Sequence, residues 1–173
     1  MAPQDVPNDD ASQASFGAPS PEPEETLATN STLDDEEDQF GGLLPGHTYM
    51  ILERETLRAI TLTSEGLRLR DVQEGQDLSN RWLCVEKNGW LGLQEPRSGR
   101  FIGHGGSSAL YAKADKFQAW ECITTRDRPG GVYQLLVPHW LQLKMVVVAE
   151  DGEGLITREH GKTLWRFLKT SDS

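Results

Sequence analysis

From residue 47 onward, the chain consists of short stretches in which apolar and polar residues alternate, with turn-forming residues between them. Alternation with a period of two is typical of β-strands that bury one face. Asn88-Gly89 suits a two-residue hairpin turn, because both central positions of that turn require positive φ. Glycines within the remaining turns mark the other strand ends, and they include Gly66, Gly105, Gly130 and Gly152. The pattern therefore predicts short strands throughout and excludes a long helix.

Two sets of aromatic residues recur at intervals of about forty residues. Three tryptophans, 38 and 45 residues apart, each open an alternating stretch, and a second set has spacings of 41 and 43. The period and the alternation favour inward-facing core positions over the alternative, that the three tryptophans are ligand platforms. The first set is Trp82, Trp120 and Trp165, with Cys84, Cys122 and Phe167 two positions further on, and the second set is Tyr49, Trp90 and Tyr133.

The two sets agree on three repeated units, which span residues 47–88, 89–130 and 131–170, each with four predicted strands. A propeller typically has four or more blades, and β-solenoids use shorter repeats. Twelve strands in three such units fit a β-trefoil, in which six strands close a barrel and three hairpins cap one end. Closure also removes exposed sheet edges, which would favour aggregation. The predicted fold is all-β, with aromatic rings of all three units in a shared core.

The N-terminal segment, residues 1–43, has a different composition from the rest of the chain. It contains eleven Asp or Glu, no Lys or Arg, and few large apolar side chains. Such a segment cannot bury enough apolar surface to offset its ordering entropy, so we predict a disordered acidic tail before a domain at 44–173. Its deletion is expected to leave thermal unfolding unchanged. The acidic stretch DDEEDQF is interpreted as a solubilising leader, with a docking motif or phosphorylation switch as the alternative.

The charge of the chain is concentrated in this tail. The net charge is −10, but residues 44–173 hold sixteen acidic and seventeen basic residues. A nearly neutral domain has no broad basic face, which argues against nucleic acid as a partner. The N-terminus has neither the basic start nor the apolar run of a secretory signal, and no stretch has the length of a membrane span. We expect a soluble cytoplasmic protein, monomeric by default, without membrane insertion.

The residue types that carry catalysis or metal binding do not cluster in the sequence. The four His residues show no metal-ligand spacing, and two Cys do not make a disulfide framework. We interpret both cysteines as buried small apolar residues rather than as nucleophiles or metal ligands. The Gly-His-Gly-Gly turn at 103–106 lacks the Lys-Ser/Thr and the helix of a phosphate loop. No cofactor, metal or catalytic group is predicted.

Three tripeptides give the domain a resemblance to a known family. NRW at 80–82, QAW at 118–120 and TLW at 163–165 occupy the places of the Q-x-W triplets of ricin-type β-trefoil lectins, although only QAW is a literal match. The openings of the first two units, from residues 47 and 89, also resemble fascin-like trefoils. LWRFLK at 164–169 is similar to fungal trefoil protease inhibitors. The resemblance covers about 47–170, and it implies a trefoil that binds a carbohydrate or a protein.

The chain departs from the lectin pattern at the sugar site. Ricin-type pockets use an Asp early in each unit, with an aromatic ring that stacks on the sugar. The corresponding hairpins here, ERET (53–56), EPRSGR (95–100) and VPHW (137–140), contain no Asp. We predict that the glutamates replace Asp as acceptors, that Trp140 is the stacking ring, and that the cationic side chains line the rim. The alternative for Trp140 is a side chain folded over the barrel rim. The alternative for the cationic residues is that they are scattered solvated charges. The candidate ligand contacts are Trp140, His139, Arg97, Arg54, Glu95 and Glu53.

We therefore predict a non-catalytic module that binds a glycan or a protein through trefoil loops, because loops on a rigid scaffold commonly carry recognition. Two other hypotheses stay open. One is a protein-interaction module of the fascin-like or inhibitor-like kind. The other is an enzyme or pathway accessory protein that uses the trefoil as a scaffold. Function inferred from fold resemblance alone is a weak argument, so the structure of the loops has to decide.

Overall fold

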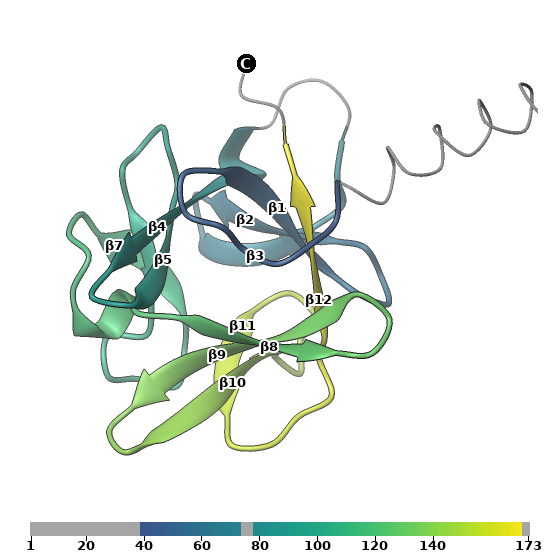
Figure 1. Ribbon diagram of the computed structural model, residues 1–173. Helices are drawn as coiled ribbons and strands as arrows, with labels where there is room; N and C mark the ends of the chain where they lie inside the picture. The colour runs from purple at the N-terminus through teal and green to yellow at the C-terminus, as the bar shows by residue number, and fades with distance from the viewer. Residues whose placement is uncertain (1–38, 74–77, 171–173) are drawn as a thin grey trace, which may run out of the picture. The chain divides into compact units, whose positions relative to one another are not determined.

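The computed structural model describes residues 39–73 and 78–170, which belong to one compact unit, and the predicted disorder of 1–38 lies outside them (Figure 1). Twelve strands form an all-β domain, as predicted. The strands are β1 (Thr48–Glu53), β2 (Ala59–Thr63), β3 (Gly66–Arg70), β4 (Trp82–Lys87), β5 (Trp90–Gln94), β6 (Phe101–Gly103), β7 (Tyr111–Ala114), β8 (Thr124–Arg128), β9 (Val132–His139), β10 (Gln142–Val148), β11 (Leu155–Arg158) and β12 (Trp165–Lys169). Two short 3-10 helices are η2 (Leu78–Asn80) and η3 (Ala119–Glu121).

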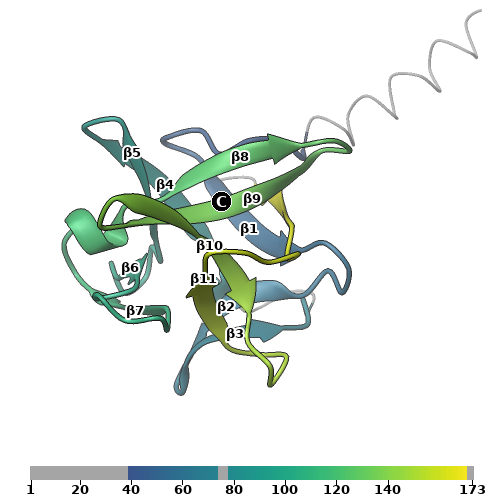
Figure 2. The ribbon, with the colours of Figure 1, turned by 90° about the horizontal axis from the view of Figure 1, so that it is seen from below.

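Six of the strands close into a barrel. The antiparallel neighbours run β1, β4 and β5 on one side and β1, β12, β9 and β8 on the other. The ring is completed between β5 and β8, where Leu91 and Ile123 exchange backbone hydrogen bonds of 3.1 and 2.7 Å. The remaining strands form the hairpins β2–β3, β6–β7 and β10–β11, arranged around one end of the barrel (Figure 2). We call β1–β4, β5–β8 and β9–β12 lobes 1, 2 and 3.

The first and last strands of each lobe pair in the same register. Tyr49 pairs with Trp82 in lobe 1 and Tyr133 with Trp165 in lobe 3, and the Leu91–Ile123 bridge occupies the equivalent place in lobe 2. Tyr49, Leu91 and Tyr133 are each 42 residues apart. The barrel core therefore repeats with a period of 42, which is more regular than the spacing of the tryptophans. This threefold register confirms the β-trefoil architecture predicted from the sequence.

The register corrects the predicted core at three positions. Trp82 and Trp165 are fully buried, and their indole nitrogens donate to Ile60 O at 2.9 Å and Val146 O at 3.1 Å. Trp120 is instead 55 % exposed, because η3 interrupts the strand and the core position passes to Ile123, three residues later. The other two corrections have the same cause, a shift of the inward register: Trp90 is 37 % exposed beside the core residue Leu91, and Cys122 is only half-buried.

The remaining predicted core residues line the barrel. Cys84 and Phe167 are fully buried, and burial raises the pKa of the Cys84 thiol to about 11. Tyr49 is buried, and Tyr133 packs against this core with its ring centroid 5.0 Å from that of Phe167. A thiol with such a pKa stays protonated at neutral pH, so Cys84 has the chemistry of a small apolar residue.

Residues 39–43 belong structurally to the domain rather than to the tail. Phe40 bridges to Leu168 of β12, and Leu43 is buried with 7 % exposure. The Tyr49 hydroxyl donates to Gly42 O at 3.3 Å and accepts from the Leu44 amide at 3.0 Å. These contacts cover the open edge of β12, so a boundary drawn at 43 and 44 divides a packed segment.

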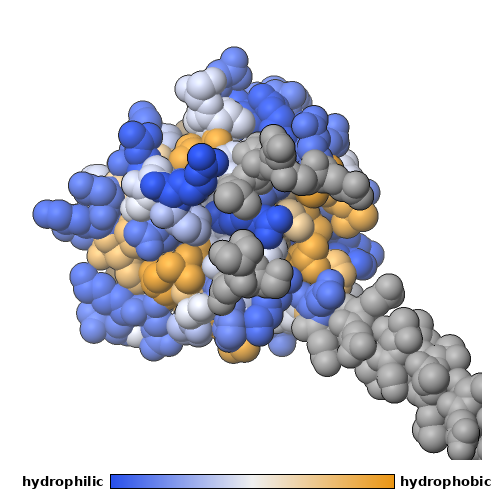
Figure 3. Space-filling view, turned by 90° about the horizontal axis from the view of Figure 1, so that it is seen from above, coloured by the Kyte–Doolittle hydropathy of each residue, from blue (hydrophilic) through white to orange (hydrophobic). Residues whose placement is uncertain are grey.

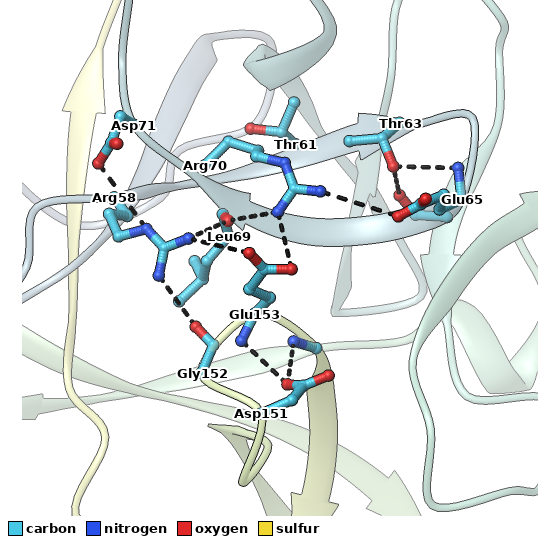
Figure 4. A network of polar contacts seen from close by, with 12 residues as sticks. Arg58, Thr61, Thr63, Glu65, Leu69, Arg70, Asp71, Asp151, Gly152 and Glu153 are labelled. Atoms are coloured by element: carbon cyan, nitrogen blue, oxygen red, sulfur yellow. Dashed lines mark hydrogen bonds and ion pairs between the residues drawn. The ribbon is translucent and has the colours of Figure 1, made fainter.

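A polar network joins the β2–β3 hairpin of lobe 1 to the β10–β11 loop of lobe 3 (Figure 4). The Arg58 guanidinium donates to Leu69 O at 2.7 Å and to Gly152 O at 3.0 Å. The Glu153 carboxylate forms ion pairs with the guanidinium groups of Arg70 at 3.1 Å and Arg58 at 3.9 Å. Arg58 thus satisfies backbone carbonyls of two lobes at once, which fixes the two hairpins against each other.

The surface of the domain is mixed in polarity. On the face seen from above, hydrophilic residues separate small apolar patches (Figure 3). The most exposed large apolar side chains are Trp140 at 92 % and Leu141 at 104 %, and both lie at the tip of the β9–β10 hairpin. Within the described ranges, no helix is long and apolar enough to cross a membrane.

Candidate functional site

The first hairpins of lobes 1 and 2 end in the same carboxylate-centred turn. Glu53 accepts backbone hydrogen bonds from Glu55 at 3.1 Å and Thr56 at 2.8 Å. Glu95 accepts from Arg97 at 3.2 Å and Ser98 at 2.7 Å. Both glutamates are buried, with exposures of 7 % and 3 %. Both carboxylates already accept hydrogen bonds from their own turns, which argues against the prediction that they accept hydrogen bonds from a ligand.

Lobe 3 has no such carboxylate, and its first hairpin folds differently. Val137 occupies the place of Glu53 and Glu95, two periods of 42 residues after the first and one period after the second. An apolar side chain cannot accept the turn amides, and the strands instead stay paired up to His139 and Gln142. The two residues left in the loop, Trp140 and Leu141, project into solvent.

Trp140 adopts a backbone conformation that bulky residues rarely take. Its φ is +59°, in the left-handed region that Gly or Asn usually fills in tight hairpins. Strained backbone of this kind is concentrated at functional sites, where surrounding structure holds it in place. Leu57 in the first hairpin of lobe 1 has a similar φ of +57°, so it is the nearly complete exposure of the indole that makes Trp140 a candidate contact.

Trp120 is presented by a second irregularity, the η3 turn of lobe 2. The Gln118 amide donates to the buried Glu121 carboxylate at 3.0 Å, which closes the turn and keeps Trp120 on its outer side. The Trp120 carbonyl accepts from the His104 amide at 3.2 Å. The literal Q-x-W triplet is thus the one whose tryptophan leaves the core.

The two departures from threefold symmetry line one cavity of about 360 Å³. Figure 2 shows the β9–β10 hairpin tip beside the η3 turn. We call this cavity the tryptophan pocket, and its lining residues include Trp90, Trp120, Trp140, His104, His139 and Cys122. Its size and its aromatic lining with a few polar groups match the usual description of small-ligand sites.

His104 forms the polar floor of the pocket and is locked in one tautomer. Its Nε2 donates to Pro138 O at 3.1 Å, and its Nδ1 accepts from the Gly106 amide at 3.0 Å. Burial lowers the pKa of His104, with a smaller contribution from the nearby His139 and Lys144. A neutral imidazole with both nitrogens engaged orients its neighbours and links lobes 2 and 3.

One ring nitrogen of His139 forms no hydrogen bond within the described part of the protein. Its ring centroid lies 5.2 Å from that of His104, and its Nδ1 is buried without a hydrogen-bond partner. Buried polar atoms are almost always paired, so each exception calls for an explanation. The His139 ring lines the pocket, but this nitrogen is shielded from solvent in the structure.

The pocket was also compared with the side chains that catalysis commonly uses: carboxylates, an activated thiol and metal ligands. Its lining residues, all within the described ranges, include no carboxylate. The Cys122 thiol donates to Gln118 O at 3.4 Å, and burial, followed by the neighbouring Glu121, raises its pKa. A protonated thiol is a poor nucleophile. Among the described residues, no group of three or more His, Cys, Asp or Glu is placed to hold a metal ion.

The six predicted contact residues have different fates in the structure. Trp140 and His139 line the pocket, whereas Arg54 and Arg97 are exposed in the turns of lobes 1 and 2 and do not line it. Sequence reasoning missed Trp90, Trp120 and His104. The Gly-rich turn around His104 was the available sign, because closely spaced glycines often mark a close approach of backbone and side chain.

The closed barrel, its three capping hairpins and the threefold register define the protein as a β-trefoil. Solved structures with the same fold include the ricin B-like lectin of Macrolepiota procera in complex with lactose, at 15 % identity and a TM-score of 0.62 over 75 % of this chain and 99 % of that chain. The designed threefold-symmetric protein ThreeFoil is 16 % identical, with a TM-score of 0.60 over 71 % of this chain and 99 % of that one.

A glycosidase also contains a similar structure. The endo-β-galactosidase of Clostridium perfringens that releases GlcNAcα1-4Gal matches at 10 % identity with a TM-score of 0.63, over 72 % of this chain but 33 % of its own. At these identities the similarity concerns the fold. No protein-family model matches the chain, and no curated protein does.

Proposed function

We propose that the protein is a non-catalytic binding module that takes a glycan in the tryptophan pocket. The observation that carries the proposal is that both breaks in the threefold symmetry, the η3 turn and the β9–β10 hairpin, place an exposed tryptophan at this one cavity. Because the other two first hairpins keep a closed, carboxylate-centred turn, the asymmetry distinguishes a single site.

The chemistry of the pocket suits a sugar. The C–H face of a pyranose packs against an indole ring, and Trp120 and Trp140 are 55 % and 92 % exposed. Sugar hydroxyls need nearby polar groups, and the His139 ring lines the pocket. Hydrolysis of a glycosidic bond normally requires a pair of carboxylates, which the lining does not contain. Binding without turnover is the function that this combination supports.

The test is glycan-array binding by the purified protein, followed by titration calorimetry with the strongest hits. We expect Trp120→Ala and Trp140→Ala each to weaken binding by about tenfold or more, because exposed aromatic platforms dominate such sites. Leu57→Ala is the matched control, since Leu57 is an exposed apolar residue in the corresponding hairpin of lobe 1. An empty array for the wild type, or equal binding by all four proteins, would overturn the proposal.

A protein ligand is the second candidate, and Leu141 is the observation that favours it. This side chain is completely exposed at the hairpin tip, next to Trp140, and it does not line the pocket. An apolar tip of this kind suits insertion into a hydrophobic groove of another protein. Leu141→Ser separates the two candidates: it removes a protein contact at the tip and leaves the pocket that a sugar would use.

A further inference from the structure

A second cavity shares Trp120 with the tryptophan pocket. It measures about 240 Å³, and we call it the side cavity. Both cavities are far larger than the roughly 30 Å³ that one water occupies. Its lining comes from lobe 2 and includes Phe101, Gly103, Gly105, Tyr111, Lys113 and Trp120. Because Trp120 lines both spaces, the two cavities adjoin at this residue.

The Gly-His-Gly-Gly turn at 103–106 also lines both cavities. Gly103 and Gly105 line the side cavity, whereas His104 and Gly106 line the tryptophan pocket. Successive residues of one turn therefore contribute alternately to the two cavities. The turn that its glycines mark in the sequence therefore lines both cavities, as Trp120 does.

Gly103 of this turn is required by the close approach of the η3 turn. A Cβ on Gly103 would lie 2.9 Å from the Trp120 carbonyl oxygen and 3.0 Å from Glu121 Oε1. Gly106 has φ +82°, and a Cβ there would already contact the indole at 3.5 Å. A side chain at Gly103 would displace the η3 turn. The glycine therefore allows the η3 turn, and Trp120 with it, to lie close to this turn.

The side cavity has the same kind of lining as the tryptophan pocket, an aromatic surface beside polar groups. The Lys113 ammonium lies 4.8 Å from the centre of the Tyr111 ring, and within the described ranges it forms no ion pair. The Tyr111 hydroxyl donates to His104 O at 3.0 Å, which ties this wall to the floor of the other cavity. One rigid unit thus supports both spaces.

We propose that the two cavities are adjoining subsites and that the bound molecule is an oligosaccharide of at least two sugar units that crosses Trp120. This inference rests on the proposed function, because it names the length of the glycan bound at the same site. The terminal unit lies in the tryptophan pocket and the next unit lies in the side cavity beside Lys113. Free monosaccharides occupy only the first subsite.

The experiment measures affinity against chain length. Galactose, glucose, mannose and N-acetylglucosamine are each immobilised as one, two and four linked units, and binding of the full chain is quantified by surface plasmon resonance. For the sugar that binds, we expect the tetrasaccharide to bind about tenfold or more tightly than the monosaccharide, because the second unit binds at high effective concentration.

Two matched variants block one cavity each. Ala114→Trp places a bulky side chain at the side cavity, and Ala119→Trp does the same at the tryptophan pocket. We expect Ala114→Trp to reduce tetrasaccharide affinity to that of the monosaccharide without changing monosaccharide binding. Ala119→Trp should remove binding of both. Lys113→Ala, at an exposed position, is expected to weaken only the longer glycans and needs no repacking.

The outcomes separate the two proposals. If the wild type binds no immobilised sugar of any length, both the proposed function and the subsite inference are overturned. If it binds monosaccharides and tetrasaccharides equally, and Ala114→Trp and Lys113→Ala change nothing, glycan binding stands and the second subsite is rejected. Length-dependent binding that is lost in Ala114→Trp and weakened in Lys113→Ala, with unchanged melting temperatures, supports both.

Discussion

At the scale of single residues, carboxylates act here as turn-forming groups. Glu53 and Glu95 each accept two backbone amides of their own hairpin, and Glu121 accepts one in η3. Burial opposes ionisation of Glu53, but hydrogen bonds from Thr56 and Glu55, with Arg58 nearby, outweigh it and hold its pKa below the usual value. The charged form of Glu53 is therefore the form that stabilises the fold.

This pKa gives Glu53 a defined part in the acid sensitivity of the protein. A carboxylate whose folded pKa is lowered stabilises the fold above its unfolded pKa of about 4.3, and that contribution is lost as pH falls through the folded pKa. We expect Glu53→Gln to lower the free energy of unfolding by about 1–3 kcal/mol at pH 7, with the difference from wild type shrinking below about pH 4. Urea titrations from pH 3 to 7 measure this.

Glu55→Gln is the control for this prediction, because the Glu55 side chain is exposed while only its backbone amide binds Glu53. Its unfolding free energy should follow that of the wild type at every pH. A gap between Glu53→Gln and wild type that stayed constant down to pH 3 would contradict the role assigned to the ionised carboxylate.

At the scale of elements, the segment 39–43 forms backbone hydrogen bonds along one edge of β12. The Lys169 amide donates to Gln39 O at 2.8 Å, and the Gly41 amide donates to Phe167 O at 3.3 Å. Together with buried Leu43, these bonds satisfy backbone groups that an edge strand would expose. Removing this segment has a cost that removal of an uninvolved tail does not have.

Two deletions test where the domain begins. Deletion of residues 1–38 is expected to leave the melting temperature unchanged, as the composition of the segment predicts. Deletion of 1–43, which the composition alone predicts to be without effect, is expected from the structural contacts to destabilise the domain by about 2–4 kcal/mol, through the lost burial of Leu43 and the lost hydrogen bonds. Differential scanning calorimetry of the two proteins decides the matter, and identical melting curves would contradict the structural boundary.

Prediction from the sequence succeeded where the pattern is local and failed where a contact decides. Strand number and turn positions follow from alternation and glycines, and the β-trefoil follows from the repeat. The position of Trp120 does not follow, because the η3 turn depends on a hydrogen bond between Gln118 and Glu121 that alternation does not encode. The Glu53 turn was missed for a similar reason: a glutamate in a loop has the same sequence pattern whether its carboxylate is free or bound to backbone amides.

At the scale of the whole molecule, the lobes are held together by different means. In the barrel, neighbouring lobes are joined by backbone pairing of β1 with β12, β4 with β5 and β8 with β9, whereas the capping hairpins of lobes 1 and 3 are joined by the Arg58 network. Arg58 bonds two backbone carbonyls that belong to different lobes. Its contribution should consequently exceed that of an ordinary surface ion pair.

Arg58→Met tests this junction, because it keeps an unbranched apolar side chain and removes the guanidinium. We expect the free energy of unfolding to fall by about 1–3 kcal/mol, measured by urea titration. Glu65→Gln is the control: Glu65 meets Arg70 at 3.9 Å with 70 % of its side chain exposed, and its loss is expected to cost little. Equal effects of the two substitutions would show that Arg58 acts only as a surface charge.

The division of the five tryptophans between barrel and surface also gives the protein two optical reporters. Trp82 and Trp165 are buried and are expected to emit at short wavelength, whereas Trp90, Trp120 and Trp140 are exposed and are expected to emit at longer wavelength. A sugar that settles on the exposed indoles shields them from acrylamide quenching and leaves the short-wavelength component unchanged. Collapse of the barrel would instead shift the emission of the sealed pair, so occupancy and integrity are readable from one fluorescence spectrum.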